Sequence, residues 1–267
     1  MSFIVLLKAE YMLVYSEVMR RKSALMAIII YPYLFAGLTL FVGFSAGSPQ
    51  SFVERVGIDP IVFMVTASYM IMAITTGVDD ILWRPLSDSW IGTLVYIIAS
   101  PVNKLKLFMA MPIPRLTLLL MMGFTSILPI YVAFYGLYGV SLTIVVVALS
   151  AIGALVMTPL GIAISGLMHV ASESWRILSI VRPLLFVFLG AYYPRMFMPL
   201  VLRLISYSIP SSYTVELVQR LLIGIASIDI VVLLGLSIAL AAIYVPLGRK
   251  SINYWEKKKV REGVKAH

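Results

Sequence analysis

The chain has 267 residues, of which 61% are hydrophobic and only 12% are charged, and its mean hydropathy is +1.00. A soluble domain is typically about 25% charged, and a soluble protein this apolar would expose large apolar patches to water. The composition therefore excludes a cytosolic enzyme and a disordered chain. The formal net charge of +9 is high for so apolar a protein, and the absence of cysteine excludes disulfides and thiolate metal sites.

An amphipathic helix is predicted over residues 1–22, ahead of the first long apolar segment. One face carries Ile4, Leu7, Tyr11, Val14 and Val18, and the opposite face carries Glu10, Ser16, Glu17 and Arg20. This pattern suits a helix that lies in the cytoplasmic membrane interface. The alternative is an ordinary leading part of the first span. A cleaved signal peptide is disfavoured, since its apolar region would be shorter and closer to the N-terminus.

Apolar segments long enough to cross a bilayer, which takes about 20 residues per helix, occur six times. They are Ser23–Gly43, Pro60–Val78, Leu116–Tyr138, Val140–Leu167, Ile177–Tyr193 and Ile230–Leu247. The second is expected to end at two solvated carboxylates, Asp79 and Asp80, and the fifth contains Arg182. The sequence thus predicts an all-α integral membrane protein with a six-span domain over residues 23–247 and a basic cytoplasmic tail over residues 248–267.

The distribution of lysine and arginine predicts the orientation, because cytoplasmic loops are enriched in them. With the N-terminus inside, 17 of the 21 cations fall on the inner side of the membrane and 4 on the outer side. We therefore expect a multi-pass protein of the cell membrane with both termini in the cytoplasm. The basic tail is expected to meet anionic lipid headgroups rather than nucleic acid.

Two segments outside the spans have helical patterns of their own. In the inner loop 83–113, Trp90, Leu94, Ile97, Ile98 and Pro101 share one face of a predicted amphipathic helix that stops at Pro101. In the outer segment 194–224, Pro194, Pro199 and Pro210 divide the chain into two short apolar helices. Neither helix is long enough to cross a bilayer, so we expect a shallow re-entrant or interfacial hairpin.

Sequence motifs for an energy source are missing. There is no Gly-Lys-Ser or Gly-Lys-Thr of a phosphate-binding loop, and no predicted span has a carboxylate near its centre, as a proton or sodium relay requires. His169, near the inner end of the fourth span, is expected to be structural. A membrane enzyme of lipid or isoprenoid metabolism using Asp79, Asp80 and Arg84 with Mg²⁺ is one alternative, and a passive channel or membrane scaffold is another.

The chain resembles the type 2 ABC exporter permeases, the membrane subunits of drug, polysaccharide and lipid exporters, over nearly its whole length. The inner loop carries the family pattern Gly-Thr-Leu followed by Ser-Pro-Val at Gly92, Thr93, Leu94, Ser100, Pro101 and Val102. The outer segment carries a proline-rich stretch that ends in Glu-x-x-x-Arg, at Pro194, Pro199, Pro210, Tyr213, Glu216 and Arg220. Val95 stands where the family has an acidic residue, and Ile209 where it often has asparagine.

The resemblance implies that separate chains bind ATP and span the membrane. A separate ABC ATPase subunit would bind ATP and Mg²⁺, so this chain would hold no cofactor and would not be an enzyme by itself. A second permease copy, identical or related, would complete the transporter. The helix containing Trp90, Gly92, Thr93, Leu94, Ser100 and Pro101 would couple to the ATPase, and the outer segment would form the outer gate.

Overall fold

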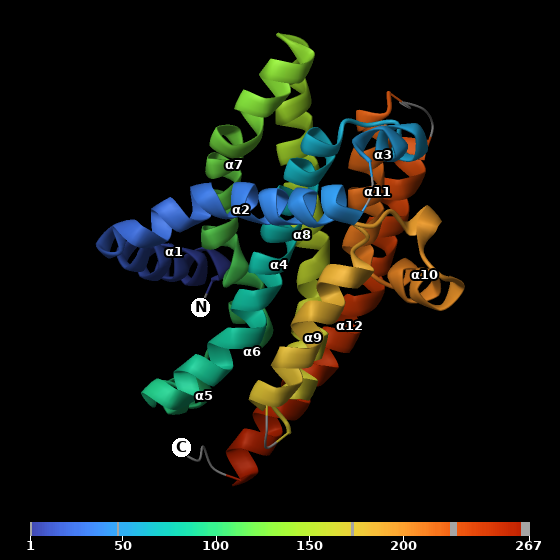
Figure 1. The fold of residues 1–267 in the computed structure, drawn as a ribbon. Helices are drawn as coiled ribbons and strands as arrows, with labels where there is room; N and C mark the ends of the chain where they lie inside the picture. Colours follow the sequence, from blue (N-terminus) through green and yellow to red (C-terminus); the bar gives the residue numbers. More distant parts are fainter. Residues whose placement is uncertain (1, 47, 172–173, 225–228, 263–267) are drawn as a thin grey trace.

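The computed structural model describes residues 2–46, 48–171, 174–224 and 229–262, and the regular structure of these residues is helical throughout (Figure 1). The helices are α1 (Phe3–Arg20), α2 (Lys22–Ala46), α3 (Pro49–Val56), α4 (Pro60–Ile91), α5 (Leu94–Ala99), α6 (Lys104–Ala110), α7 (Pro112–Tyr135), α8 (Tyr138–Met168), α9 (Ser174–Phe188), a 3₁₀ turn η1 (Arg195–Phe197), α10 (Leu200–Tyr207), α11 (Pro210–Leu222) and α12 (Asp229–Glu262). Proline occupies the first turn of α3, α4, α7 and α11, where its missing N–H costs no helical hydrogen bond.

Four helical segments are long and apolar enough to cross a membrane. They are α4, the continuous stretch Lys104–Tyr135 that joins α6 and α7, α8, and Ile230–Arg261 of α12. They include the second, fourth and sixth predicted spans and most of the third, whose predicted end at Tyr138 lies past the end of α7 at Tyr135. The first predicted span lies in α2, of which Ile29–Phe41 qualifies only as a shorter apolar helix. The fifth, Ile177–Tyr193, lies only partly in α9, which ends at Phe188. The 15 residues of α9 extend roughly 22 Å at 1.5 Å per residue, so the count of six spans stays a prediction.

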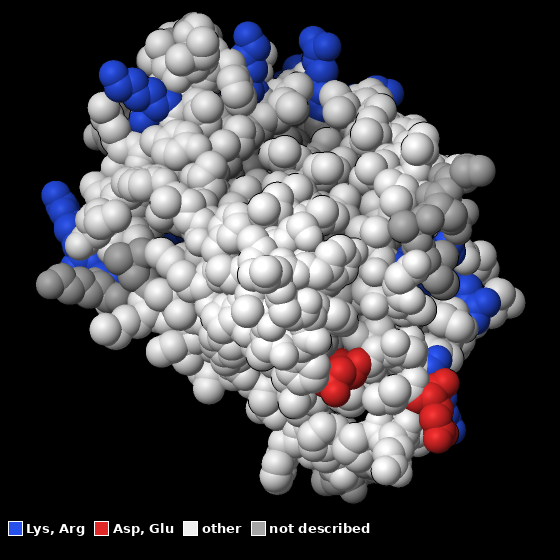
Figure 2. All heavy atoms as spheres, turned by 90° about the horizontal axis from the view of Figure 1, so that it is seen from above, with Lys and Arg blue, Asp and Glu red and all other residues white. Residues whose placement is uncertain are grey.

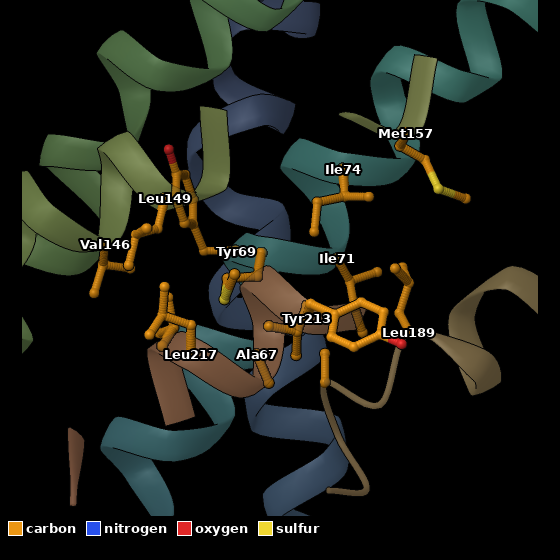
Figure 3. Close-up of a cluster of buried hydrophobic side chains, with 14 of the residues drawn as sticks. Ala67, Tyr69, Ile71, Ile74, Val146, Leu149, Met157, Leu189, Tyr213 and Leu217 are labelled. Carbon is orange, nitrogen blue, oxygen red and sulfur yellow. The ribbon is translucent and has the colours of Figure 1, made fainter. Parts of the chain in front are cut away.

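Helix α8 lies at the centre of the bundle and contacts α4, α7, α11 and α12. The core is formed where side chains of α4, α8 and α11 converge, among them Ile71, Ile74, Met157, Tyr213 and Leu217 (Figure 3). Close contact between helices depends on glycine. A Cβ atom on Gly166 of α8 would lie 2.6 Å from the carbonyl carbon of Ser251 in α12. The structure therefore packs these two backbones directly against each other.

Helices α1 and α2 run across the side of the bundle rather than along it (Figure 1). Helix α2 contacts α4 and α7 and buries Ala36, but most of its large apolar side chains are exposed, including Leu34, Leu38 and Phe41. Apolar surface of this size on one helix is typical of contact with lipid or with another chain. The protein thus has a packed centre around α8 and a more open flank at α1 and α2.

Several predicted boundaries are wrong. Helix α4 continues past Asp79 and Asp80 to Ile91, so the carboxylates do not end it. It ends at Gly92, whose φ of +83° is the left-handed conformation that glycine adopts readily. Trp90 therefore belongs to α4, and the single helix expected from Trp90 to Pro101 is divided at Gly92 and Thr93. The basic tail, as far as residue 262, continues α12 without a break.

The two ends of the bundle differ in charge. One end, which we call the basic end, carries α5, the start of α6 and the last turns of α12 (Figure 1), with Lys104, Lys106, Lys257, Lys258, Lys259 and Arg261. The opposite end carries α3 and the turn between α7 and α8. Figure 2 views the molecule from that opposite end, where most of the surface is uncharged and lysine and arginine lie at the rim.

Candidate functional site

The Gly-Thr-Leu motif lies between α4 and the short helix α5 at the basic end, with Leu94 as the first residue of α5. Thr93 Oγ1 donates a hydrogen bond to Asp88 Oδ1 at 2.7 Å, and Arg84 Nε donates to the other oxygen of the same carboxylate at 3.1 Å. Leu94 is buried in a small core with Phe108 and Trp255. These contacts hold the first turn of α5 against the end of α4, so α5 and the end of α4 form one rigid unit.

The other face of this unit is apolar and open. Tyr96 is 77% exposed and Ile91 is 72% exposed, and Trp90 and Val95 are also exposed. Large exposed apolar side chains at the end of a helix pair are typical of a contact with another protein or with a membrane. Of the predicted coupling residues, Leu94 and Thr93 anchor the helix, while Trp90 lies on the exposed side.

A buried lysine holds the Ser-Pro-Val turn that follows α5. Lys104 Nζ donates to the carbonyl oxygens of Ser100 and Val102, at 2.7 and 3.1 Å, and lies 3.7 Å from Glu256 of α12. Pro101 itself is exposed. The sequence does not distinguish Lys104 from the other cations, because its partners are mostly backbone atoms that no sequence motif reveals.

Three of the four tryptophans form one cluster beside this unit. The rings of Trp83 and Trp90 are 5.3 Å apart and those of Trp83 and Trp175 are 5.6 Å apart, both edge to face. Edge-to-face aromatic pairs are favourable beyond their buried area. Since Trp175 belongs to α9, the cluster joins the end of α4 to a second helix.

Helix α1 is attached to α4 by an ion pair that the sequence reasoning missed. Glu10 was expected on the polar face of α1, but it is buried, and Arg84 Nη1 donates to its Oε2 at 3.3 Å. Burial raises the pKa of the Glu10 carboxyl, against the opposing effect of Arg84. The four-residue spacing of Leu6, Glu10, Val14 and Val18 places the carboxylate in the buried stripe.

Asp79 and Asp80 form ion pairs with arginines of two different helices. Arg182 Nε of α9 donates to Asp79 Oδ1 at 2.7 Å, and Arg115 of α7 forms a short ion pair with Asp80 and lies 4.0 Å from Glu17 of α1. Among the described residues, no group of three or more acidic, histidine or cysteine side chains is placed to hold a metal ion. The two carboxylates are thus engaged by arginines on separate helices.

The prolines of the outer segment mark the starts of its helices, as the sequence predicts. Pro194 precedes η1, Pro199 precedes α10 and Pro210 opens α11. The two helices differ in burial, because α10 exposes Leu200 and Leu204 whereas most of α11 is buried against α8 and α12. Helix α11 therefore belongs to the core of the bundle, and α10 lies on its surface.

Arg195 is the central residue of this segment. Its guanidinium lies 4.3 Å from the ring centre of Tyr213 and 4.8 Å from that of Tyr207, and it forms an ion pair with Glu216. Arg220 Nη2 contacts the other oxygen of Glu216 at 2.5 Å. The predicted residues Tyr213, Glu216 and Arg220 thus meet around an arginine that the sequence reasoning counted only as an outer charge.

The two groups of residues lie on different parts of the bundle and do not form one site. One is an exposed apolar surface at the end of α4 and at α5, and the other is a buried polar network at α11. Comparisons with protein-family models, with curated proteins and with solved structures found no match to this chain.

Proposed function

We propose that this chain is the permease subunit of an ATP-driven exporter in the cell membrane, with both termini in the cytoplasm. The observation that supports it best is the unit formed by the end of α4 and by α5. Its base is fixed by Leu94 and by the Asp88–Thr93 hydrogen bond, while Tyr96 and Ile91 are exposed. A soluble ATPase that binds this apolar surface would move α4 as a rigid body.

The partner chain would supply the energy, because ATP and Mg²⁺ would bind there and this chain would hold no cofactor. A second permease copy, identical or related, would complete the complex. The exposed apolar side of α2 offers surface for it. The segment with Arg195, Tyr213 and Glu216 would act as the outer gate, since the aromatic and ionic contacts of Arg195 give it a defined closed arrangement.

The enzyme alternative has less support than the permease. It needs Asp79 and Asp80 to share a metal ion, but each is engaged by an arginine from a different helix. A carboxylate that is paired in this way must release its guanidinium before it binds a cation. A passive channel or scaffold does not account for an apolar helix that is exposed at the basic end.

Substitutions on α5 test the proposal. The tagged chain is purified from its native membrane, and the co-purifying ATPase activity is measured for the wild type, for Tyr96→Asp and for the control Tyr138→Asp. Tyr138 is 67% exposed at the opposite end of the bundle. We expect Tyr96→Asp to lose the ATPase and Tyr138→Asp to retain it. Equal ATPase activity in all three preparations would contradict the coupling role.

A further inference from the structure

Three adjoining cavities surround the side chain of Arg115, which lines all of them. One, of about 280 Å³, lies toward α9 and is lined by Asp79 and Trp175. The second, of about 440 Å³, lies between α1 and α4. The third, of about 400 Å³, lies between α1, α2, α4 and α7. The second and third also share Glu17, so they form one hollow, which we call the α1 pocket.

The wall of the α1 pocket carries equal numbers of acidic and basic side chains. The acids are Glu17, Asp80 and Asp88, and the bases are Arg21, Arg84 and Arg115. The formal net charge of the whole chain is +9, but the charges that line this pocket sum to zero. A pocket without net charge disfavours a ligand that carries a net charge of either sign. Charge complementarity here favours a zwitterion, whose positive and negative groups each find an opposite charge.

Two side chains on the wall have unused capacity for such a ligand. Arg115 binds one oxygen of Asp80, but the other oxygen, Oδ2, is buried and has no hydrogen-bond partner among the described residues. A buried acceptor of this kind is costly unless a donor reaches it. On the other side, Glu17 lies 4.0 Å from Arg115 and 3.6 Å from Arg21. Its side chain is 45% exposed, so another anionic group can take its place between the two guanidiniums.

The third cavity continues the pocket into an apolar region. Its wall includes Ala27 and Tyr31 of α2, Met72 of α4 and Leu119 of α7, next to the charged Arg21 and Arg115. A ligand that fills both regions needs an apolar chain joined to a charged head. This is the chemistry of a membrane lipid.

We propose that the α1 pocket binds a zwitterionic phospholipid with a primary ammonium group, of the phosphatidylethanolamine type. The phosphate takes the place of the Glu17 carboxylate between Arg115 and Arg21, the ammonium donates to Asp80 Oδ2, and the acyl chains follow Tyr31, Met72 and Leu119. A bound lipid of this kind joins α1 and α2 to α4 and α7. The inference goes beyond the proposed transport function and does not depend on it, because it concerns a resident lipid within one chain.

The headgroup chemistry makes the proposal selective. A phosphatidylcholine has no ammonium N–H to donate to Asp80 Oδ2, and a phosphatidylglycerol has no cation at all. Phosphatidylcholine therefore leaves the buried carboxylate oxygen without a donor, and phosphatidylglycerol offers it only an uncharged hydroxyl group and adds a net negative charge. Hydrogen bonds to charged groups are strong enough that losing one changes affinity by roughly tenfold. We therefore expect phosphatidylethanolamine to bind about tenfold more tightly than either of the other lipids.

Native mass spectrometry of the full chain, purified in a mild detergent and stripped of lipid, tests the proposal. The three dioleoyl lipids are titrated against the wild type, Ala27→Phe and Arg21→Gln. The matched controls are Ala242→Phe, on the exposed side of α12, and Arg55→Gln, on the exposed helix α3. Because the Arg21 side chain is 71% exposed, its substitution leaves the fold intact even if Ala27→Phe does not.

The expected result is one phosphatidylethanolamine per wild-type chain, with its binding lost or weakened about tenfold in both test variants and kept in both controls. Equal binding of the three lipids would overturn the proposal. So would wild-type phosphatidylethanolamine binding by Arg21→Gln.

Discussion

His169 Nε2 lies 3.0 Å from the carbonyl oxygen of Leu82, so a side chain at the end of α8 is hydrogen-bonded to the backbone of α4. A carbonyl oxygen only accepts, so Nε2 carries the proton. One turn earlier in α8, Ser165 Oγ donates to the carbonyl of Ile81 at 3.0 Å. That carbonyl lacks a helical partner because Pro85, four residues on, has no N–H. The two side chains therefore fasten α8 to α4 where the proline interrupts its hydrogen bonds.

The first prediction concerns stability at acid pH. Desolvation by burial lowers the pKa of His169 to about 4, whereas an unfolded histidine titrates near 6.5. The folded state therefore binds fewer protons than the unfolded state below about pH 6.5, and stability falls as the pH drops from there toward 4. We expect the titration of this residue to lower the free energy of unfolding by about 2 kcal/mol between pH 7 and pH 5. Chemical unfolding in detergent at both pH values measures it.

His169→Gln is the matched control, because its amide donates to Leu82 without titrating. This variant should lose less stability than the wild type between pH 7 and pH 5, while other groups titrate equally in both. The same loss in the two proteins would show that His169 is not the titrating group.

A second prediction tests the close contact between α8 and α12. In Gly166→Ala the new methyl group would overlap the backbone of Ser251 and disturb the hydrogen bond from Ser251 Oγ to the Ala163 carbonyl. Overpacking of this kind costs about 1–3 kcal/mol. Gly235→Ala, inside α12 with no atom near the new methyl group, should be neutral or slightly stabilising. Thermal unfolding of the two variants measures the difference.

What the sequence predicted and what it missed have physical causes. Proline restricts the backbone of the residues next to it, so Pro194, Pro199 and Pro210 predicted the starts of the outer helices. The break at Gly92 was missed because the apolar spacing of Trp90 and Leu94 fits a continuous helix equally well. The partners of buried charges were missed because they lie far away along the chain: Glu10 meets Arg84 of α4, and Arg195 meets Glu216 of α11.

A third prediction concerns the attachment of α1. Arg84→Met removes the cation that Glu10 and Asp88 share and leaves two buried carboxylates without it. An unpaired buried charge is costly. We therefore expect the free energy of unfolding to fall by about 2 kcal/mol and hydrogen exchange in α1 to become faster. The exposed Arg55→Met serves as the control. Unchanged exchange in α1 would show that the ion pair does not hold this helix.

The last prediction separates the two roles of Arg195, which makes an ion pair with Glu216 and stacks on Tyr213 and Tyr207. Arg195→Lys keeps the charge but loses the planar group that lies over both rings, and Arg195→Met loses both interactions. We expect the stability to fall in the order wild type, lysine, methionine, by about 1 and then a further 1–2 kcal/mol.

Combining Glu216→Gln with each variant closes a double-mutant cycle measured by chemical unfolding. If the ion pair matters, Glu216→Gln costs less in the methionine background than in the wild type, because its partner is already gone. Additive losses would instead assign the stabilisation to the tyrosine rings alone, and Arg195 would then hold α11 by stacking rather than by charge.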